Sequence, residues 1–290
     1  MSSPESPSSS ASPSSFDVLG NSEPAVLAER RGPVLLLRLN RPQVRNALNA
    51  ELVAALHAEL LAAQSEAQVR CVMLCGAGKA FSAGADLKAL QDLGRASSEE
   101  NKADSQRLAD LLHLIYTGRL PVVAAVEGAA VAGGAGLASA CDLVVAGEGA
   151  RLGYTEVRLG FVAAIVMVFL LRSVGEKHAR ELLLTGRLVT AQEARRMGLI
   201  NEVVPDGGAE ERALELAAEL AQSSSTALAT TREMLSLLPG MGLAESLRYA
   251  VGVNAWTRTT ADLQEGVAAF LEKRAPGWRP ETVPPESAQK

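Results

Sequence analysis

The sequences KAFSAGADLK at residues 79–88 and VEGAAVAGGAG at residues 126–136 decide the fold expected for this chain. In each stretch, small residues stand where a strand is expected to pass into a helix. Small residues let a ligand approach the backbone, and the first N–H groups of a helix have no partner inside the helix. Two such N–H groups aimed at one position would form an oxyanion hole. The two stretches therefore predict a site that stabilises developing negative charge.

The pattern outside these stretches favours an α/β fold. Short apolar runs predict buried strands at residues 34–39, 69–74, 121–126 and 143–146. Helices are expected between them, beginning after Asn49 and after Ser97. Two capping boxes are expected further on, one at residues 173–176 and one at residues 190–193. Such alternation of strands and helices is typical of layered α/β proteins.

The chain is expected to divide into a core and a helical region. Residues 1–22 begin with a Ser/Pro-rich run and should form a disordered tail. The core, with the site, is expected over residues 23–206. Helices are then predicted around 210–222, 225–238, 243–258 and 260–274, so residues 207–280 form the helical region. Residues 281–290 should be frayed.

The composition excludes several classes of protein. The 33 acidic residues exceed the 28 basic ones, and no long basic run is present, so nucleic-acid binding has little support. No apolar run is long enough to span a bilayer. The three cysteines are expected to be buried free thiols, and no cluster has the spacing of a metal site. A soluble, cytoplasmic protein without a bound metal is expected.

Several motifs in a fixed order carry a resemblance to a known family. They are LNRP at 39–42, RNAL at 45–48, AFSAGADL at 80–87, GG at 133–134 with ACD at 140–142, LTGR at 184–187, AQEA at 191–194, GLI at 198–200 and FLEKR at 270–274. Together they resemble the crotonase, or enoyl-CoA hydratase/isomerase, superfamily from about residue 24 to 280. Each motif is weak alone, whereas the ordered set is specific.

The resemblance implies a spiral of β-β-α units followed by a helical trimerisation region. It also implies an acyl-CoA thioester as substrate, a role in fatty acid metabolism, and a homotrimer or dimer of trimers. No separate cofactor is expected, because coenzyme A is part of the substrate. These properties come from the resemblance and not from periodicity or composition.

The same resemblance assigns the catalytic groups. The backbone N–H groups of Ala85 and Gly133 would form the oxyanion hole, and Glu156 would handle the proton at the α-carbon of the thioester. Apolar surroundings should raise the pKa of Glu156, as proton transfer requires. Without the resemblance, a surface glutamate paired with Arg158 is the favoured interpretation of Glu156.

Further positions match the family's coenzyme A-binding segments. The resemblance assigns them to the pantetheine, adenine and phosphate ends of the ligand: Arg45, Ala47, Ala83, Asp86, Leu87, Gly134 and Lys273. Lys273 would reach the ligand from a neighbouring subunit. Asp86 is also readable as a helix cap, and Lys273 as part of a solvated helix face.

One position departs from the family pattern. Two-glutamate hydratases carry a second glutamate where this chain has Gly136. A hydratase of 2-enoyl-CoA is favoured, with Glu127, Tyr154 or Asp86 as candidates for a second base. A Δ3,Δ2-enoyl-CoA isomerase using Glu156 alone is the first alternative, and a non-catalytic acyl-CoA-binding paralogue is the second. The acyl pocket is expected to be lined by the helix around residues 88–115 and by residues 161–167.

Overall fold

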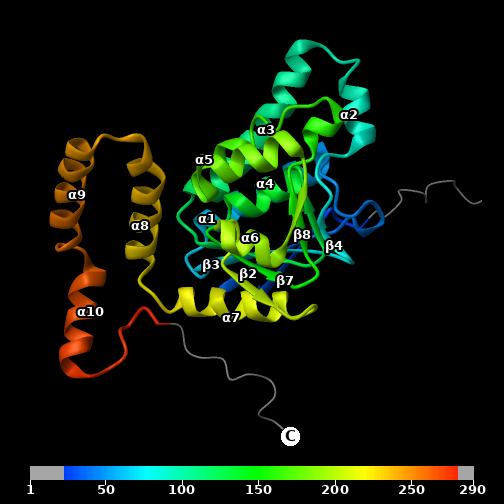
Figure 1. Cartoon of the computed structure of the whole chain (residues 1–290). Helices are drawn as coiled ribbons and strands as arrows, with labels where there is room; N and C mark the ends of the chain where they lie inside the picture. Colours follow the sequence, from blue (N-terminus) through cyan, green and yellow to red (C-terminus); the bar gives the residue numbers. More distant parts are fainter. Residues whose placement is uncertain (1–22, 280–290) are drawn as a thin grey trace, which may run out of the picture.

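The structure is a computed structural model that describes residues 23–279. The tails expected over residues 1–22 and 281–290 lie outside these described residues. Within them the elements form two β-sheets with helices packed around them (Figure 1).

The larger sheet has six strands in the order β1-β2-β3-β5-β7-β10. Its strands are parallel except for the antiparallel pair β1 and β2. They span Val26–Arg31 (β1), Val34–Leu39 (β2), Cys71–Gly76 (β3), Val122–Val126 (β5), Leu143–Gly147 (β7) and Glu202–Val204 (β10).

Both faces of the larger sheet are buried, which explains the continuous apolar runs. Along β2, Leu35 and Leu37 contribute to one hydrophobic cluster, whereas Val34 and Leu36 contribute to the other. Successive side chains of a strand point to opposite faces, so a strand covered on both sides needs apolar residues at every position. The first cluster includes residues of the helices that cover one face, and the second includes the helix that covers the other.

The smaller sheet has four strands in the order β4-β6-β8-β9. Strands β4 (Ala80–Ser82), β6 (Ala129–Val131) and β8 (Arg151–Gly153) are parallel, and β9 (Leu188–Thr190) is antiparallel to β8. The chain visits the two sheets in turn: β3 then β4, β5 then β6, β7 then β8, with helical segments after each pair. This repetition is the expected spiral of β-β-α units, and the predicted fold class is confirmed.

The helices begin and end largely where the capping residues indicate. Asn49 caps α1, Ser97 caps α3 in a capping box with Glu100, and Thr190 caps α6 in a box with Glu193. The helices of the body are α1 (Ala50–Ser65), α2 (Leu87–Leu93), α3 (Ser98–Thr117), α4 (Gly133–Ala140), α5 (Met167–Thr185), α6 (Ala191–Met197) and α7 (Ala209–Ala221).

One local prediction is wrong. No capping box forms at residues 173–176, because the Ser173 hydroxyl donates a hydrogen bond to the Phe169 carbonyl instead. The interruption of α5 comes from Gly175, which has φ 72° and non-helical geometry. The region after residue 174 also contains β9 and β10. Both are only three residues long, so neither provides a hydrophobic period for a sequence pattern to detect.

The predicted helices after residue 206 are all present. Helix α7, which begins just after the expected boundary, packs on β3, β5 and β7 through Ala209, Ala213 and Ala217. The helices that extend from the body are α8 (Ser225–Leu237), α9 (Leu243–Thr257) and α10 (Ala261–Glu272). Figure 1 shows α8 beside the body and α9 and α10 on its outer side.

Among the helices of residues 23–279, none combines the length and the apolar composition that a membrane-spanning helix requires.

Arg232 attaches α8 to the body. Its side chain is 5% exposed, and its guanidinium pairs with Asp142 at 2.8 Å and donates to the carbonyls of Ile115 and Gly118. Breaking a buried pair leaves the partner charge uncompensated, so Arg232→Ala should lower the free energy of unfolding by about 3–5 kcal/mol. Denaturant titration measures this.

The control for that substitution is Arg180→Ala, which removes an exposed pair with Glu176. Exposed pairs of this kind contribute about 0.3–0.5 kcal/mol. Equal effects of the two substitutions would contradict the anchoring role of Arg232.

Candidate active site

Three strands of the smaller sheet bring the predicted catalytic residues to one edge. Strands β4, β6 and β8 are neighbours and run parallel, so their carboxyl ends lie together. Ala85 follows β4, Gly133 follows β6 and Glu156 follows β8, each within a few residues. Ligand sites of parallel sheets commonly form at this edge.

The loop that carries Ala85 is fixed by Leu48. The Leu48 N–H donates to the Gly84 carbonyl at 2.7 Å, and the Asp86 N–H donates to the Leu48 carbonyl at 2.9 Å. These bonds flank Ala85, whose own N–H has no hydrogen-bond partner within residues 23–279. Gly133 is the first residue of α4, where an N–H has no acceptor inside the helix.

The two loops approach closely because Gly84 and Gly133 have no side chain. Gly84 has φ +87°, and a Cβ there would lie 2.7 Å from the Ala132 Cβ and 3.2 Å from the Gly133 nitrogen. A Cβ on Gly133 would lie 3.8 Å from the Ala85 nitrogen. The two free amides therefore belong to segments in direct contact, as an oxyanion hole requires.

Ala132 has a backbone conformation that non-glycine residues rarely adopt. It caps α4 with φ 53° and ψ −122°, and its N–H donates to the Gly153 carbonyl at 2.7 Å. Such strain costs about 1–3 kcal/mol and persists where the surroundings hold it. The bond to Gly153 ties the start of α4 to β8, the strand that leads to Glu156.

Glu156 is buried instead of facing solvent. It begins the short helix Glu156–Leu159, its side chain is 7% exposed, and its Oε2 atom has no hydrogen-bond partner among residues 23–279. No ion pair with Arg158 forms within these residues, so the surface-pair interpretation is not supported. Burial raises the pKa of Glu156. A buried carboxyl with one unpartnered oxygen and a raised pKa is suited to proton transfer.

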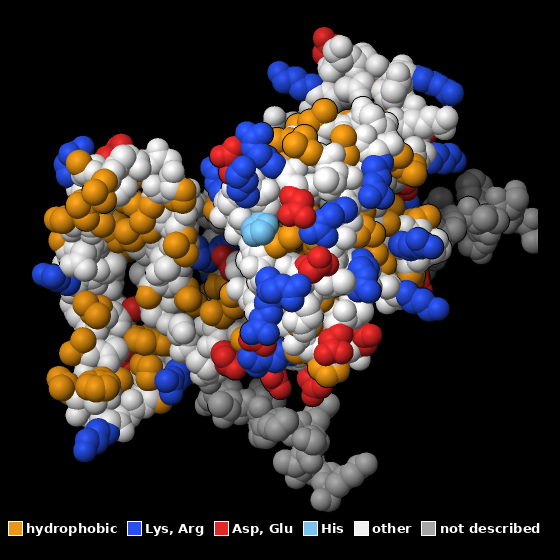
Figure 2. Space-filling model, viewed as in Figure 1, with side chains coloured by type: hydrophobic (Ala, Val, Ile, Leu, Met, Phe, Trp, Pro, Cys, Tyr) orange, Lys and Arg blue, Asp and Glu red, His pale blue; other side chains and the backbone are white. Residues whose placement is uncertain are grey.

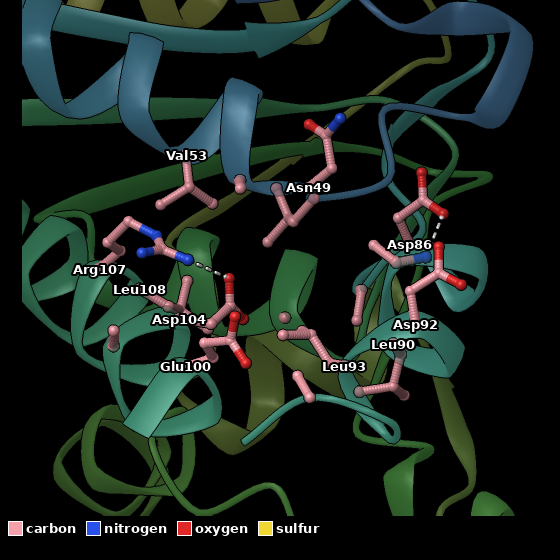
Figure 3. Close-up of a pocket in the computed structure, with 17 residues that line it drawn as sticks. Asn49, Val53, Asp86, Leu90, Asp92, Leu93, Glu100, Asp104, Arg107 and Leu108 are labelled. Atoms are coloured by element: carbon pink, nitrogen blue, oxygen red, sulfur yellow. Dashed lines mark hydrogen bonds and ion pairs between the residues drawn. The ribbon is translucent and has the colours of Figure 1, made fainter. Parts of the chain in front are cut away.

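A cavity of about 580 Å³ opens beside the two amides. Ala85, Gly133 and Leu48 are among its lining residues, and α2 and α3 supply much of the wall (Figure 3). Glu156 is not one of the lining residues of this cavity. The expected wall from residues 88–115 is present, but it consists of two helices, α2 and α3, instead of one. Residues 161–167 do not contribute to the cavity lining.

The space beside Gly136 is filled. A Cβ on Gly136 would lie 2.1 Å from Cγ1 and 2.5 Å from Cβ of Val166, the residue that precedes α5. Val166 is 3% exposed and belongs to the main hydrophobic cluster. The position of the family's second glutamate is therefore closed to any side chain unless Val166 changes as well.

The three candidates for a second base all have other partners. Glu127 accepts hydrogen bonds from the Gly207 and Ala209 N–H groups. The Tyr154 hydroxyl lies 2.6 Å from the Ser139 hydroxyl, and burial raises its pKa, so it stays protonated. Asp86 caps helix α2 and forms an ion pair with Arg41.

Asp86 is both a helix cap and part of an ion pair. Its carboxylate accepts from the Lys88 and Ala89 N–H groups at the start of α2 and pairs with Arg41 at 3.0 Å. Burial acts to raise the pKa of Asp86, but the hydrogen bonds from Arg41 and the helix start outweigh it, and the net pKa is lowered. The cap interpretation of Asp86 is thus confirmed.

The other predicted binding residues are divided between two places. Arg45 and Ala47 flank the buried Asn46 in one loop, near the loop with Ala83 and the exposed Leu87. Gly134 contacts Ser82, because a Cβ there would lie 2.5 Å from the Ser82 carbonyl. Lys273 ends α10, on the opposite side of the molecule from β4 and α2 (Figure 1). One chain therefore does not bring Lys273 to the site.

Asn46 is a residue that sequence reasoning missed. It is fully buried, accepts from the Arg41 N–H, and donates to the Ala77 and Ala80 carbonyls. The Ser82 hydroxyl in turn donates to the Asn46 carbonyl. Asn46 thus joins the loop after β2 to the strand that leads to Ala85. Its place inside the RNAL motif is the signal that could have identified it.

Within residues 23–279, no group of three or more His, Cys, Asp or Glu side chains is arranged to hold a metal ion. The three cysteines are free; Cys71 and Cys75 are buried and Cys141 is half-buried.

Comparisons with known proteins agree with this geometry. A family model described as enoyl-CoA hydratase/isomerase matches residues 29–281. The chain belongs to this family. Its members act on acyl-CoA thioesters, and the match spans both the body and the terminal helices.

Individual relatives cover most of the chain. It is 53% identical over 246 residues to a Thermus thermophilus protein named "Putative enoyl-CoA hydratase", covering 85% of this chain and 97% of that one. It is 36% identical to the 2,3-dehydroadipyl-CoA hydratase of Escherichia coli, covering 88% and 98%. A crystal structure of an enoyl-CoA hydratase from Mycobacterium smegmatis matches with a TM-score of 0.83 at 33% identity, covering 88% and 99%.

The contact between Gly136 and Val166 can be tested by stability. Gly136→Ala should lower the free energy of unfolding by about 1–3 kcal/mol, since overpacking forces the helices apart. In Val166→Gly the obstructing atoms are absent, so adding Gly136→Ala to that variant should lower the free energy of unfolding by a smaller amount. Thermal or denaturant unfolding of the four proteins measures the coupling. Additive effects would contradict the contact.

Proposed function

We propose that this protein is a 2-enoyl-CoA hydratase, with the thioester carbonyl held by the N–H groups of Ala85 and Gly133. The observation that carries the proposal is that Ala85 and Gly133, whose amides have no partner within residues 23–279, line the same cavity. Addition of water to the β-carbon moves negative charge onto the thioester oxygen. Two fixed donors stabilise that charge without reorganising, and losing one costs about 2.7–4 kcal/mol of barrier.

Glu156 supplies the proton in this proposal. Its raised pKa keeps the carboxyl protonated at higher pH than an ordinary glutamate, so it can donate to the α-carbon of the enolate. The resulting carboxylate can recover a proton from the water that adds to the β-carbon. The balance is one water added across the double bond. This route needs no second glutamate, which fits the closed space beside Gly136.

Coenzyme A is proposed to lie along the loops that hold Arg45 and Ala47 and residues 83–87. Arg45 and Leu87 are exposed and accessible to a ligand. No further cofactor takes part in this mechanism, because the thioester supplies the activating carbonyl.

A Δ3,Δ2-enoyl-CoA isomerase is the second candidate. The closed space beside Gly136 favours it, since moving a proton between carbons needs a single carboxyl. The two reactions differ in product mass, because hydration adds one water and isomerisation adds nothing. Mass spectrometry of products from a 2-enoyl-CoA and a 3-enoyl-CoA separates them. Saturable binding of acyl-CoA without turnover of either would indicate a non-catalytic paralogue.

Replacing Glu156 by Gln should lower kcat for hydration by about 10²–10⁴-fold, the usual contribution of a positioned acid or base. In the unchanged protein, kcat/KM should fall as the pH rises through the raised pKa of Glu156, because the protonated carboxyl is the active form. A spectrophotometric hydration assay across pH measures both.

The matched control is Glu148→Gln, an exposed carboxylate outside the cavity lining. Glu148→Gln should leave both kcat and the pH dependence of kcat/KM unaltered. A Glu156→Gln protein that retains full activity, or a profile without the alkaline decline, contradicts the proton-donor role.

We also propose that the chain assembles as a homotrimer or a dimer of trimers through α8–α10. These helices carry exposed apolar side chains, among them Leu243 (78%), Val251 (70%) and Phe270 (83%). Figure 2 shows apolar side chains gathered over these helices. Apolar surface of this extent marks an interaction site. In such an assembly Lys273 could approach a neighbouring site.

The assembly can be tested by light scattering after size exclusion. The mass should be three or six times that of one chain, and Val251→Asp should reduce it, because a charge would be buried at the interface. Leu184→Asp, an exposed apolar position at the end of α5, is the control and should leave the mass unchanged. A monomer at micromolar concentration would contradict the proposal.

A further inference from the structure

The cavity beside the two amides has an uneven distribution of charge. Its walls are apolar near Val53, Leu90, Leu93 and Leu108. Its polar rim is acidic, with the four carboxylates Asp86, Asp92, Glu100 and Asp104. Arg107 is the one cationic side chain that lines it within the described residues. An acyl chain bound in this cavity would therefore contact apolar side chains and lie close to carboxylates.

Two of the carboxylates are paired with cations and two are not, and the unpaired Asp92 and Glu100 lie at the solvent-exposed rim of the cavity. Asp86 pairs with Arg41, and Asp104 pairs with Arg107 at 2.9 Å. Neither Asp92 nor Glu100 forms an ion pair with any residue between 23 and 279. Figure 3 shows Glu100, Asp104 and Arg107 along one side of the cavity and Asp92 on the other. Arg107, the single cation lining the cavity in the described part of the chain, is thus already paired, whereas negative charge remains on both sides.

Glu100 is fixed in its ionised form by its local structure. Its carboxylate accepts a hydrogen bond from the Ser97 N–H at the start of α3, and this bond holds its pKa below the ordinary value. The capping box also restrains the position of the side chain. The negative charge at the cavity rim is therefore a stable feature of the fold.

From these contacts we infer that the acyl chain accepted by this protein is uncharged, and that an acyl chain ending in a carboxylate is excluded. The inference rests on the proposed function for its substrate class. A terminal carboxylate in this cavity would lose its hydration against an apolar wall. It would also be repelled by Asp92 and Glu100, and no unpaired cation lines the cavity within residues 23–279 to compensate it. A methyl end would instead gain contacts with the leucines of α2 and α3.

Two thioesters of equal chain length test this inference. 2-Hexenoyl-CoA ends in a methyl group, and 2,3-dehydroadipyl-CoA ends in a carboxylate. The full-length protein should have a kcat/KM at least about tenfold higher for 2-hexenoyl-CoA, the size expected for one close uncompensated charge pair. Calorimetric binding of the saturated pair hexanoyl-CoA and adipyl-CoA should show the same order.

A double variant assigns the preference to the two carboxylates. In Asp92→Asn/Glu100→Gln the ratio between the two substrates should fall by about tenfold, because both uncompensated charges are removed. Gln at position 100 can still complete the capping box, so α3 should keep its start. Glu99→Gln is the matched control: it is exposed, adjacent in sequence and outside the cavity lining, and should leave the ratio unaltered.

The outcomes separate this inference from the proposed function. If neither enoyl thioester is hydrated but hexanoyl-CoA binds more tightly than adipyl-CoA, the hydratase proposal fails and the charge selectivity stands. If 2,3-dehydroadipyl-CoA is hydrated as well as 2-hexenoyl-CoA, or adipyl-CoA binds as tightly, the inference is overturned. A ratio that the double variant leaves unchanged overturns the role of Asp92 and Glu100.

Discussion

The parallel pairing of β4, β6 and β8 is the constraint on which the candidate site depends. These strands are only three residues long, yet their alignment places the segments after them at one sheet edge. The amides of Ala85 and Gly133 and the carboxyl of Glu156 come from three separate turns of the spiral. Hydrogen bonds between main chains position them, so the arrangement depends little on the side chains of the strands.

Close packing at this edge forms the site and also restricts which side chains fit there. Gly84 and Gly133 allow two loops to touch, and Asn46 and Leu48 hold one of them in place. The same packing closes the position beside Gly136 with Val166. A chain with one buried carboxyl at this site must use it for every proton that moves, unless water takes part. The strain at Ala132 is maintained by the surrounding contacts.

Sequence patterns predicted the long elements well and the short ones poorly. The helices capped by Asn49, Ser97 and Thr190 begin where their side chains indicate, because a cap is a local interaction. Strands β8, β9 and β10 were not predicted, since three residues show no period. Strand β1 was not predicted either, because five of its six residues are exposed and it forms no apolar run. Ser173 shows the limit of local motifs, because its hydroxyl bonds within α5 instead of forming a cap.

The sequence by itself determined the family, the buried strands of the larger sheet, the terminal helices and the residues to consider at the site. Those features follow from ordered motifs and from hydrophobic runs that are read along the chain. Only the tertiary structure decided that, among residues 23–279, the amide of Ala85 is left free and Oε2 of the buried Glu156 has no partner. It also decided that Val166 fills the space beside Gly136. It also decided that carboxylates from the loop before α2, from α2 and from α3 line one cavity together with Leu48 and Val53. These properties are relations between segments distant in sequence, and such relations exist only once the sheets and helices have packed.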